Sequence, residues 1–314
     1  MLSNFLHSIL KTNSYQILAL PEDASGRKYF RVTKDVESFI LKEYLKDKYD
    51  PKDFINITHI LQKNNIKVPK IYNHDDNLGL MLIEDLGTQT VKDFIEAQNF
   101  DQESKLNIYK NIIDLLIHLQ QIDSSILTKK HDLNVLLEGL SLFINFFPQY
   151  LNIDISEIEK TFFLNRFQNI LENFNFSKDC FVHRDFHVEN IMFKESAYSI
   201  IDYQDASVGS PIYDLVSLVE DARIDMNQYL ADKIITYYCD KKQIKYSSIK
   251  DEYDLIAAQR NLRILGVFSY HMIRNNNDKY IKYIPRVLNY LKRDLSNPLL
   301  ENIITWLSSK KIMI

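Results

Sequence analysis

The 314-residue sequence predicts an α+β fold with two lobes, a small β-rich N-terminal lobe and a larger helical C-terminal lobe. The length corresponds to about two domains of roughly 150 residues each. Up to residue 87 the apolar residues fall in short runs rich in β-branched and aromatic side chains. After residue 87 they recur at the three- and four-residue spacing of long amphipathic helices. We therefore expect one lobe over residues 1–87 and the other over residues 88–314.

The N-terminal lobe is predicted to contain a small sheet and one helix. Five short runs separated by polar turns have the composition of strands. They span Tyr15–Leu20, Lys28–Thr33, Ser38–Lys42, Lys70–His74 and Gly79–Glu84. Between the third and fourth runs, Pro51 marks the start of a helix, because proline is favoured at the first helical position and Phe54, Ile57 and Leu61 follow at helical spacing.

The C-terminal lobe is predicted to be mostly helical. In its first long segment Leu106, Tyr109, Ile113 and Leu116 share one helix face. The exception is residues 180–205, where apolar runs are short and polar residues are dense. We expect the chemistry of the protein to be concentrated in that segment.

Composition excludes several functional classes. No two of the six glycines lie closer than eight residues, so the glycine-rich motifs of Rossmann domains and Walker-type phosphate loops are absent. The net charge of −4 argues against a nucleic-acid partner. The N-terminus lacks the pattern of a signal peptide, no apolar run approaches 18 residues, and two cysteines fit a reducing compartment. We expect a cytoplasmic protein with no membrane association and no obligate protein partner.

One motif in the polar segment carries a specific chemistry. Residues 183–190 read HRDFHVEN and residues 200–205 read IIDYQD. This is H-R-D-x-x-x-x-N with a second aspartate twelve residues after the asparagine, the spacing of a protein-kinase-like catalytic loop. In such a loop Asp185 would accept the proton of the nucleophile, and Asn190 and Asp202 would hold Mg²⁺, which prefers hard oxygen ligands. A buried ion-paired turn capped by Asn190 would explain the first three residues but not the complete set.

The motif and its surroundings resemble the aminoglycoside phosphotransferase and choline kinase family. The resemblance includes IDYQDA at residues 201–206 and GSPIYDLVSL at residues 209–218. Within the family the sequence is most similar to the kinases that phosphorylate the 1-hydroxyl of N-acetylmuramate and N-acetylglucosamine in cell-wall recycling. DASGRKYFRV at 23–32 resembles the phosphate hairpin of that subgroup, and QRNLRILG at 259–266 and IPRVL at 284–288 resemble its last helices. The resemblance extends from about residue 20 to about residue 293.

The resemblance implies an ATP- and Mg²⁺-dependent kinase with defined roles for its loop residues. Asp185 is then the catalytic base, and Asn190 and Asp202 are the metal ligands. Asp214 is a buried carboxylate that steadies the loop, and His183 supports it by packing and hydrogen bonding.

The resemblance also implies a nucleotide site in the N-terminal lobe. Its expected residues are Ser25, Gly26, Arg27, Lys28, Lys42, Glu84 and Leu86. Arg27 and Lys28 alternate across a strand, so only one of them can face ATP. Lys42 stands where a kinase has its lysine, but the helix at 52–64 has no glutamate to pair with it. Contact with the phosphates and a solvated position at the strand end both remain open for Lys42. Glu84 and Leu86 fit a hinge that reads adenine.

The acceptor is expected to be a small molecule. Only residues 206–212 separate Asp205 from Tyr213, which leaves no platform for a peptide substrate. The candidate acceptor contacts are His187, Asp205, Arg260 and Arg263. The two arginines favour an anionic group such as the lactyl carboxylate of N-acetylmuramate, although ion pairing within the lobe explains them equally well. His187 is equally compatible with an ordinary surface position.

Two alternative functions remain at this stage. Another acceptor of the same family, an aminoglycoside or choline or a related amino alcohol, would be cationic and would favour acidic or aromatic pockets. A nucleotide-binding pseudokinase with a regulatory role is disfavoured by the intact Asp185, Asn190 and Asp202.

Overall fold

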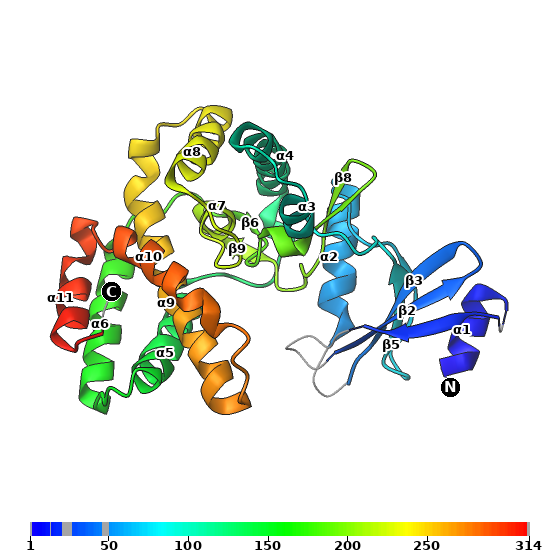
Figure 1. Cartoon of the computed structure of the whole chain (residues 1–314), viewed down its shortest axis with the longest axis horizontal. Helices are drawn as coiled ribbons and strands as arrows, with labels where there is room; N and C mark the ends of the chain where they lie inside the picture. The colour runs from blue at the N-terminus through cyan, green and yellow to red at the C-terminus, as the bar shows by residue number, and fades with distance from the viewer. Residues whose placement is uncertain (1, 13, 21–26, 46–49, 313–314) are drawn as a thin grey trace. The chain divides into compact units, whose positions relative to one another are not determined.

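The computed structural model describes residues 2–12, 14–20, 27–45 and 50–312. The chain divides into two compact units, one formed by Met1–Gln98 with Val188–Asp205 and the other by Asn99–His187 with Ala206–Ile314. A mixed fold with a β-rich first part and a helical second part is confirmed (Figure 1).

The N-terminal unit is built on a five-stranded antiparallel sheet of order β1-β2-β3-β5-β4. Its strands are β1 (Gln16–Ala19), β2 (Lys28–Lys34), β3 (Glu37–Glu43), β4 (Ile71–Asp75) and β5 (Leu80–Glu84). All five predicted strands are present. The predicted helix is α2 (Pro51–Lys63), whose N-cap Asp50 accepts a hydrogen bond from the backbone N–H of Lys52 at 3.0 Å. This cap satisfies one of the backbone donors that every helix leaves unpaired at its start.

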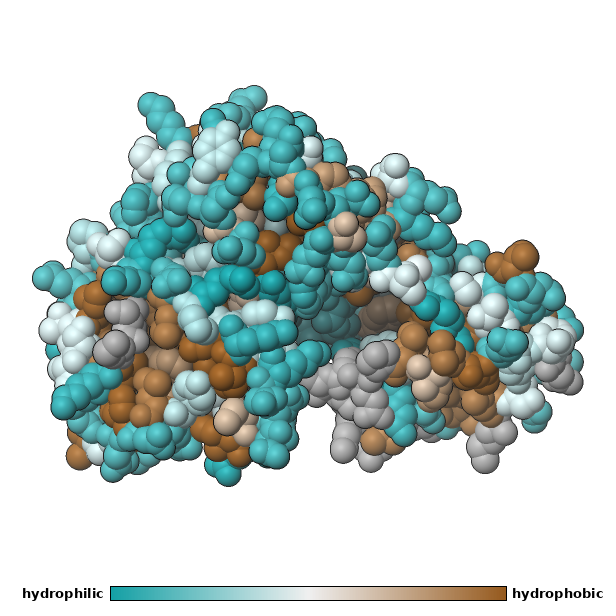
Figure 2. All heavy atoms as spheres, viewed as in Figure 1, coloured by the Kyte–Doolittle hydropathy of each residue, from teal (hydrophilic) through white to brown (hydrophobic). Residues whose placement is uncertain are grey.

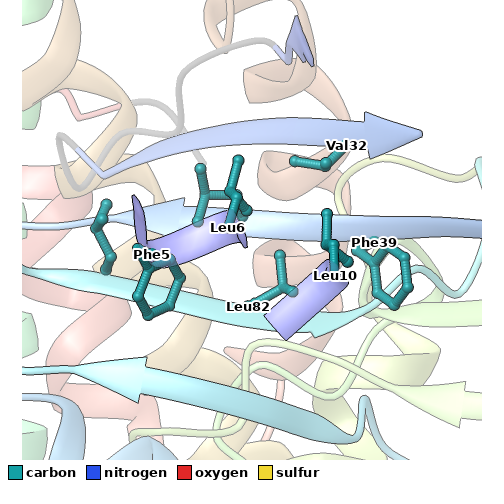
Figure 3. Packing of buried hydrophobic residues seen from close by; sticks show 8 residues of the cluster. Phe5, Leu6, Leu10, Val32, Phe39 and Leu82 are labelled. Atoms are coloured by element: carbon teal, nitrogen blue, oxygen red, sulfur yellow. The ribbon is translucent and has the colours of Figure 1, made fainter. Parts of the chain in front are cut away.

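A second helix, α1 (Leu2–Leu10), precedes the sheet, and the prediction of a single helix in this lobe was wrong. Phe5, Leu6 and Leu10 line one side of α1 and are buried. They pack with Val32 and Leu82 from the sheet, and Figure 3 shows these side chains gathered between the helix and the strands. Burial of apolar surface on this face is what fixes the short helix, since nine residues alone would not form a stable one.

The segment that follows the catalytic motif also belongs to the N-terminal unit. It contains η2 (Val188–Asn190) and the hairpin of β7 (Ile191–Lys194) and β8 (Ala197–Ile200). Helix α3 (Val91–Ala97) packs on this hairpin, with the rings of Phe94 and Phe193 4.3 Å apart. Because of this packing the unit extends to Gln98 instead of stopping at residue 87, where the sequence placed the boundary.

The C-terminal unit consists of helices around a short two-stranded ladder of β6 (Cys180–Val182) and β9 (Ser207–Gly209). Its helices are α4 (Gln102–Gln120), α5 (Leu133–Tyr150), α6 (Glu157–Asn173), α7 (Ile212–Val219), α8 (Gln228–Lys242), α9 (Tyr246–Asn275), α10 (Ile284–Asp294) and α11 (Glu301–Ser309), with 3-10 turns η1 (Ser124–Ile126), η3 (Ile281–Tyr283) and η4 (Pro298–Leu300). Helix α9 is the central element, and most of its residues from Glu252 to Ser269 are buried.

Helices α5 and α9 approach each other closely at Gly266. A Cβ atom on Gly266 would lie 2.3 Å from the backbone nitrogen of Phe143 on α5, so only glycine fits. The outer sides of α4 and α8 carry mainly hydrophilic side chains on the face drawn in Figure 2. In the described ranges, no helix has both the length and the apolar character needed to cross a membrane.

Candidate active site

The N-terminal unit contains a cavity of about 370 Å³ bounded by the sheet, α2 and the β7–β8 hairpin. Its apolar lining includes Leu20, Ile40, Phe54, Ile83, Met192 and Ile201. Its polar lining includes Arg31, Lys42, Glu84, Asn190, Asp202 and Gln204. Apolar walls with a few convergent polar groups are typical of a site for a planar base that carries charged groups. Five of the residues predicted for nucleotide or metal binding therefore lie around one cavity: Lys42, Glu84, Leu86, Asn190 and Asp202.

Lys42 lies on β3 and points into this cavity. Its side chain is only 1% exposed, and its Nζ lies 4.6 Å from the ring centroid of Phe54 on α2. The alternative of a solvated lysine at a strand end is therefore wrong. A buried ammonium over an aromatic face is held partly by a cation–π interaction.

The end of β5 is fixed by a buried ion pair that the sequence analysis did not find. Arg31 on β2 donates from Nε to Asp85 Oδ2 at 2.6 Å and from Nη2 to Asp85 Oδ1 at 3.1 Å. Arg31 Nη2 also donates to the carbonyl of Gly87 at 3.1 Å. Although burial opposes ionisation, the hydrogen bonds from Arg31 and from the Gly87 N–H lower the pKa of Asp85. This pair holds the backbone of residues 84–87 beside the cavity, where a hinge would contact a base.

The β7–β8 hairpin brings Asn190 and Asp202 to the same edge of the cavity. The backbone N–H of Ile201 donates to the carbonyl of Asn190 at 3.0 Å, which places residues 190 and 202 next to each other at the open end of the hairpin. Tyr203 anchors the segment, since its hydroxyl lies 2.8 Å from Thr58 Oγ1 and its ring stacks on Phe54.

Asp202 adopts a φ of +61°, a left-handed conformation that is costly for a residue with a side chain. Strained backbone conformations of this kind are concentrated at functional positions. The contacts of Tyr203 with Thr58 and Phe54 fix the next residue and so help to maintain the conformation of Asp202.

Polar groups next to Asp202 come from the residue that precedes β2 and from the loop of Asp202 itself. Arg27 Nη2 lies 3.7 Å from Asp202 Oδ1, and Gln204 Nε2 donates to the same oxygen at 2.9 Å. Lys28 is exposed and does not line the cavity, whereas Tyr29 does, as the alternation of side chains along β2 requires. Ser25 and Gly26, the other predicted phosphate contacts, lie outside the described residues.

The donor set at this edge suits Mg²⁺. Asn190 offers an amide oxygen and Asp202 a carboxylate that is 41% exposed. Within the described ranges, no cluster of three or more His, Cys, Asp and Glu side chains could hold a metal by itself. Mg²⁺ is commonly bound by one or two protein oxygens together with water and substrate phosphates, so two ligands are sufficient when a nucleotide supplies the others.

In the C-terminal unit, the catalytic loop after β6 is tied to α7 by Asp214. The buried carboxylate of Asp214 accepts hydrogen bonds from the backbone N–H groups of His183 at 2.6 Å and Arg184 at 2.9 Å. Arg184 has a φ of +78°, so this strained turn depends on its two hydrogen bonds to Asp214. Burial raises the pKa of Asp214 to about 7 against the opposing effect of these hydrogen bonds.

Asp185 follows this turn and carries a carboxylate favoured in its ionised form. Burial opposes ionisation, but the surrounding positive charges, that of Arg263 first, outweigh it and lower the pKa of Asp185. His187 is 4% exposed, so the alternative of a surface histidine is wrong. Burial, reinforced by the charge of Arg223, lowers the pKa of His187 well below the usual value, which keeps its imidazole neutral.

The remaining candidate acceptor residues occupy different environments. Arg260 is 3% exposed and donates from Nη2 to Ser217 Oγ at 2.8 Å. Arg263, one turn further along α9, is half-buried. Asp205 is the last residue of the N-terminal unit and is exposed.

A five-stranded sheet with a lysine-containing cavity, together with an HRD loop in a helical unit, defines the kinase-like class of phosphotransferases. The chain belongs to the phosphotransferase enzyme family, whose model matches residues 16–247. It is an ATP-dependent phosphotransferase that acts on a small molecule.

Comparisons with individual proteins agree with this assignment. The chain is 26% identical over 303 residues to an N-acetylmuramate/N-acetylglucosamine kinase of Neisseria meningitidis, covering 93% of this chain and 89% of that protein. Its fold is similar to that of an ADP-bound aminoglycoside phosphotransferase, with a TM-score of 0.64 and 17% identity over 93% of this chain and 97% of the other. It is also similar to a choline kinase from Streptococcus pneumoniae, with a TM-score of 0.64 and 14% identity over 93% and 98% of the two chains.

Proposed function

We propose that the protein transfers the γ-phosphoryl group of ATP to the 1-hydroxyl of N-acetylmuramate or N-acetylglucosamine. The observation that carries the choice of acceptor is the match to a kinase named for these two sugars over 93% of the chain. The similarity to aminoglycoside and choline kinases concerns the fold alone. A cytoplasmic site of action stays a prediction.

In this proposal the N-terminal unit binds the nucleotide. Glu84 and Leu86 contact adenine through their backbone groups, and Lys42 and Arg27 contact the phosphates. Asn190 and Asp202 hold Mg²⁺, which when bound neutralises charge on the phosphate oxygens. Arg27 Nη2 lies 3.7 Å from Asp202 Oδ1, so Asp202 would exchange this ion pair for the metal when the metal is bound.

Asp185 is proposed to receive the proton of the sugar hydroxyl. The oxygen of that hydroxyl forms the new bond to phosphorus while the bond from phosphorus to the β–γ bridging oxygen breaks, and ADP leaves. A carboxylate with a lowered pKa is a weak base, so it can accept the proton only late in a loose transition state. An anomeric hydroxyl suits this base, because it is more acidic than an ordinary alcohol.

The test is an acceptor panel with purified protein, ATP and Mg²⁺, in which release of ADP is measured with N-acetylmuramate, N-acetylglucosamine, choline and kanamycin. We expect release with the two N-acetyl sugars, and NMR of the product should show coupling between phosphorus and the anomeric proton. Coupling to another ring proton would refute the 1-hydroxyl. Activity confined to choline or kanamycin would refute the sugar and leave the phosphotransferase assignment intact.

A further inference from the structure

Among the residues that the structure describes, none forms a hydrogen bond or a close ion pair with the guanidinium of Arg263. Its charge interacts with the carboxylate of Asp185 through space. Its five N–H donors lie in a half-buried position, where donors without a hydrogen bond cost free energy. Arg260 differs, because its Nη2 bonds to Ser217 and its Nε and Nη1 are enclosed by protein. Of the two arginines, Arg263 is the more exposed, and none of its donors is among the enclosed side-chain atoms without a hydrogen bond.

The aliphatic stem of Arg263 packs closely against the neighbouring helix, at a position where that helix has a glycine. A Cβ atom on Gly139 of α5 would lie 3.0 Å from Cδ and 3.2 Å from Cβ of Arg263. The stem of the side chain therefore packs on the backbone of α5, which limits its freedom before any ligand arrives. This restriction reduces the entropy lost on binding.

The charge of Arg263 acts on the catalytic loop. It is the strongest of the charges that lower the pKa of Asp185, and it also lowers the pKa of His131. A molecule whose hydroxyl meets Asp185 would thus bring its neighbouring substituents within reach of Arg263. The buried charge of Arg260, one turn away, adds to the positive potential there.

We propose that Arg263 determines the preference between the two sugars by binding the carboxylate of the lactyl group, which N-acetylmuramate carries and N-acetylglucosamine lacks. The inference rests on the proposed function and adds a specificity-determining residue to it. Guanidinium and carboxylate match in a two-point hydrogen-bonded pair, which a neutral acceptor cannot form. Arg263 then contributes to binding of the acidic sugar and little to transfer itself.

The experiment compares Arg263→Met with the wild type on both sugars and reads the ratio of the two kcat/KM values, because the loss of the charge near Asp185 affects both sugars alike. We expect kcat/KM for N-acetylmuramate to fall about 10- to 100-fold more than kcat/KM for N-acetylglucosamine, mainly through KM. Arg274→Met, on the exposed end of the same helix, is the matched control and should leave both values unchanged.

Each other outcome has a definite meaning. A ratio of the two kcat/KM values equal to that of the wild type would overturn the inference, whether or not kcat falls. An equal loss of kcat on both sugars would then mean that Arg263 acts only through its charge near Asp185. A wild-type enzyme that phosphorylates neither sugar would overturn the proposed function and this inference with it. Thermal unfolding of the variant separates these results from misfolding, and Arg263→Lys should restore part of the preference if charge is what matters.

Discussion

At the scale of single residues, Asp185 and Asp214 differ in the direction in which their surroundings shift the pKa, and therefore in their expected roles. Both carboxylates lie in the catalytic-loop region of the C-terminal unit, yet the pKa of Asp185 is lowered by arginines and the pKa of Asp214 is raised to about 7 by burial. Asp214 faces two backbone N–H groups and fixes the loop. In the proposed function Asp185 faces the acceptor, which is the division of roles expected of a base and its support.

Asp185→Asn should abolish most turnover and leave nucleotide binding intact. Asparagine keeps the size and shape of the side chain but cannot accept a proton from the acceptor hydroxyl. We expect kcat to fall by about 10²- to 10⁴-fold, the usual contribution of a general base. Steady-state kinetics give kcat, and calorimetry gives the affinity for ATP with Mg²⁺.

Asp202→Ala is the matched variant for this measurement. It removes a proposed metal ligand, so Mg²⁺-dependent nucleotide affinity should drop while the Asp185 variant retains it. If Asp185→Asn keeps full turnover, Asp185 has no role in proton transfer.

At the scale of helices and strands, the contact of α5 with α9 supports both the core and the proposed acceptor site. Gly266 allows the two backbones to meet at Phe143, and Gly139 leaves room for the side chains of Gln259 and Arg263. Gly266 therefore faces backbone atoms, whereas Gly139 faces side-chain atoms, which adjust at a lower cost than a helix backbone. The same substitution should have different consequences at the two positions.

Gly266→Ala should destabilise the protein more than Gly139→Ala. An added methyl on Gly266 forces α5 and α9 apart, and overpacking of this kind costs about 1–3 kcal/mol. On Gly139 it meets Gln259 Nε2 at 2.9 Å and should cost about 1 kcal/mol through the hydrogen bond from Gln259 to Leu136. Urea unfolding followed by the fluorescence of Trp306, the single tryptophan, measures both. An equal loss of the free energy of unfolding in the two variants would contradict the close contact of Gly266 with the backbone of Phe143.

Features that depend on local sequence could be predicted, whereas contacts between distant segments could not. Strand composition and the Pro51 helix start are local signals, and the motif spacing of Asp185 and Asn190 is local too, so they could be found without a structure. The pairs of Arg31 with Asp85 and of Gly139 with Arg263 join residues far apart in the chain. Their meeting depends on strand register and helix packing, which no local pattern encodes. Burial of Lys42 and His187 was missed for the same reason.

At the scale of the whole molecule, the stability of the C-terminal unit is coupled to pH through buried groups near the catalytic loop. His131 is 9% exposed and its ring lies 4.1 Å from that of Tyr213. Burial, helped by the charges of Arg184 and Arg263, lowers the pKa of His131 to about 3. His187 is shifted in the same direction, whereas the pKa of Asp214 is shifted upward. The net slope of stability with pH is the sum of these opposing contributions.

His131→Gln isolates one of these contributions. Between about pH 3 and pH 6.5 the unfolded chain holds a proton on His131 that the folded chain does not, so this residue makes the free energy of unfolding fall as the pH is lowered. Its contribution to stability is complete above pH 6.5 and is lost toward pH 3. Asp214 acts with the opposite sign, because its contribution is complete below about pH 4 and is lost as the pH rises toward 7.

Removing His131 should therefore make the fall in stability between pH 6 and pH 4.5 shallower by up to about 1.4 kcal/mol per pH unit, the limit for one proton. Urea titrations at several pH values, read from Trp306 in the same unit as His131, give the slope for each variant. His118→Gln, at an exposed position on α4, is the matched histidine substitution. A slope for His131→Gln equal to that of the wild type would mean that His131 takes up its proton at the same pH in the folded and the unfolded chain. Loss of the packing contacts of the imidazole changes the free energy of unfolding by the same amount at every pH. The change in slope therefore reports the protonation of His131 alone.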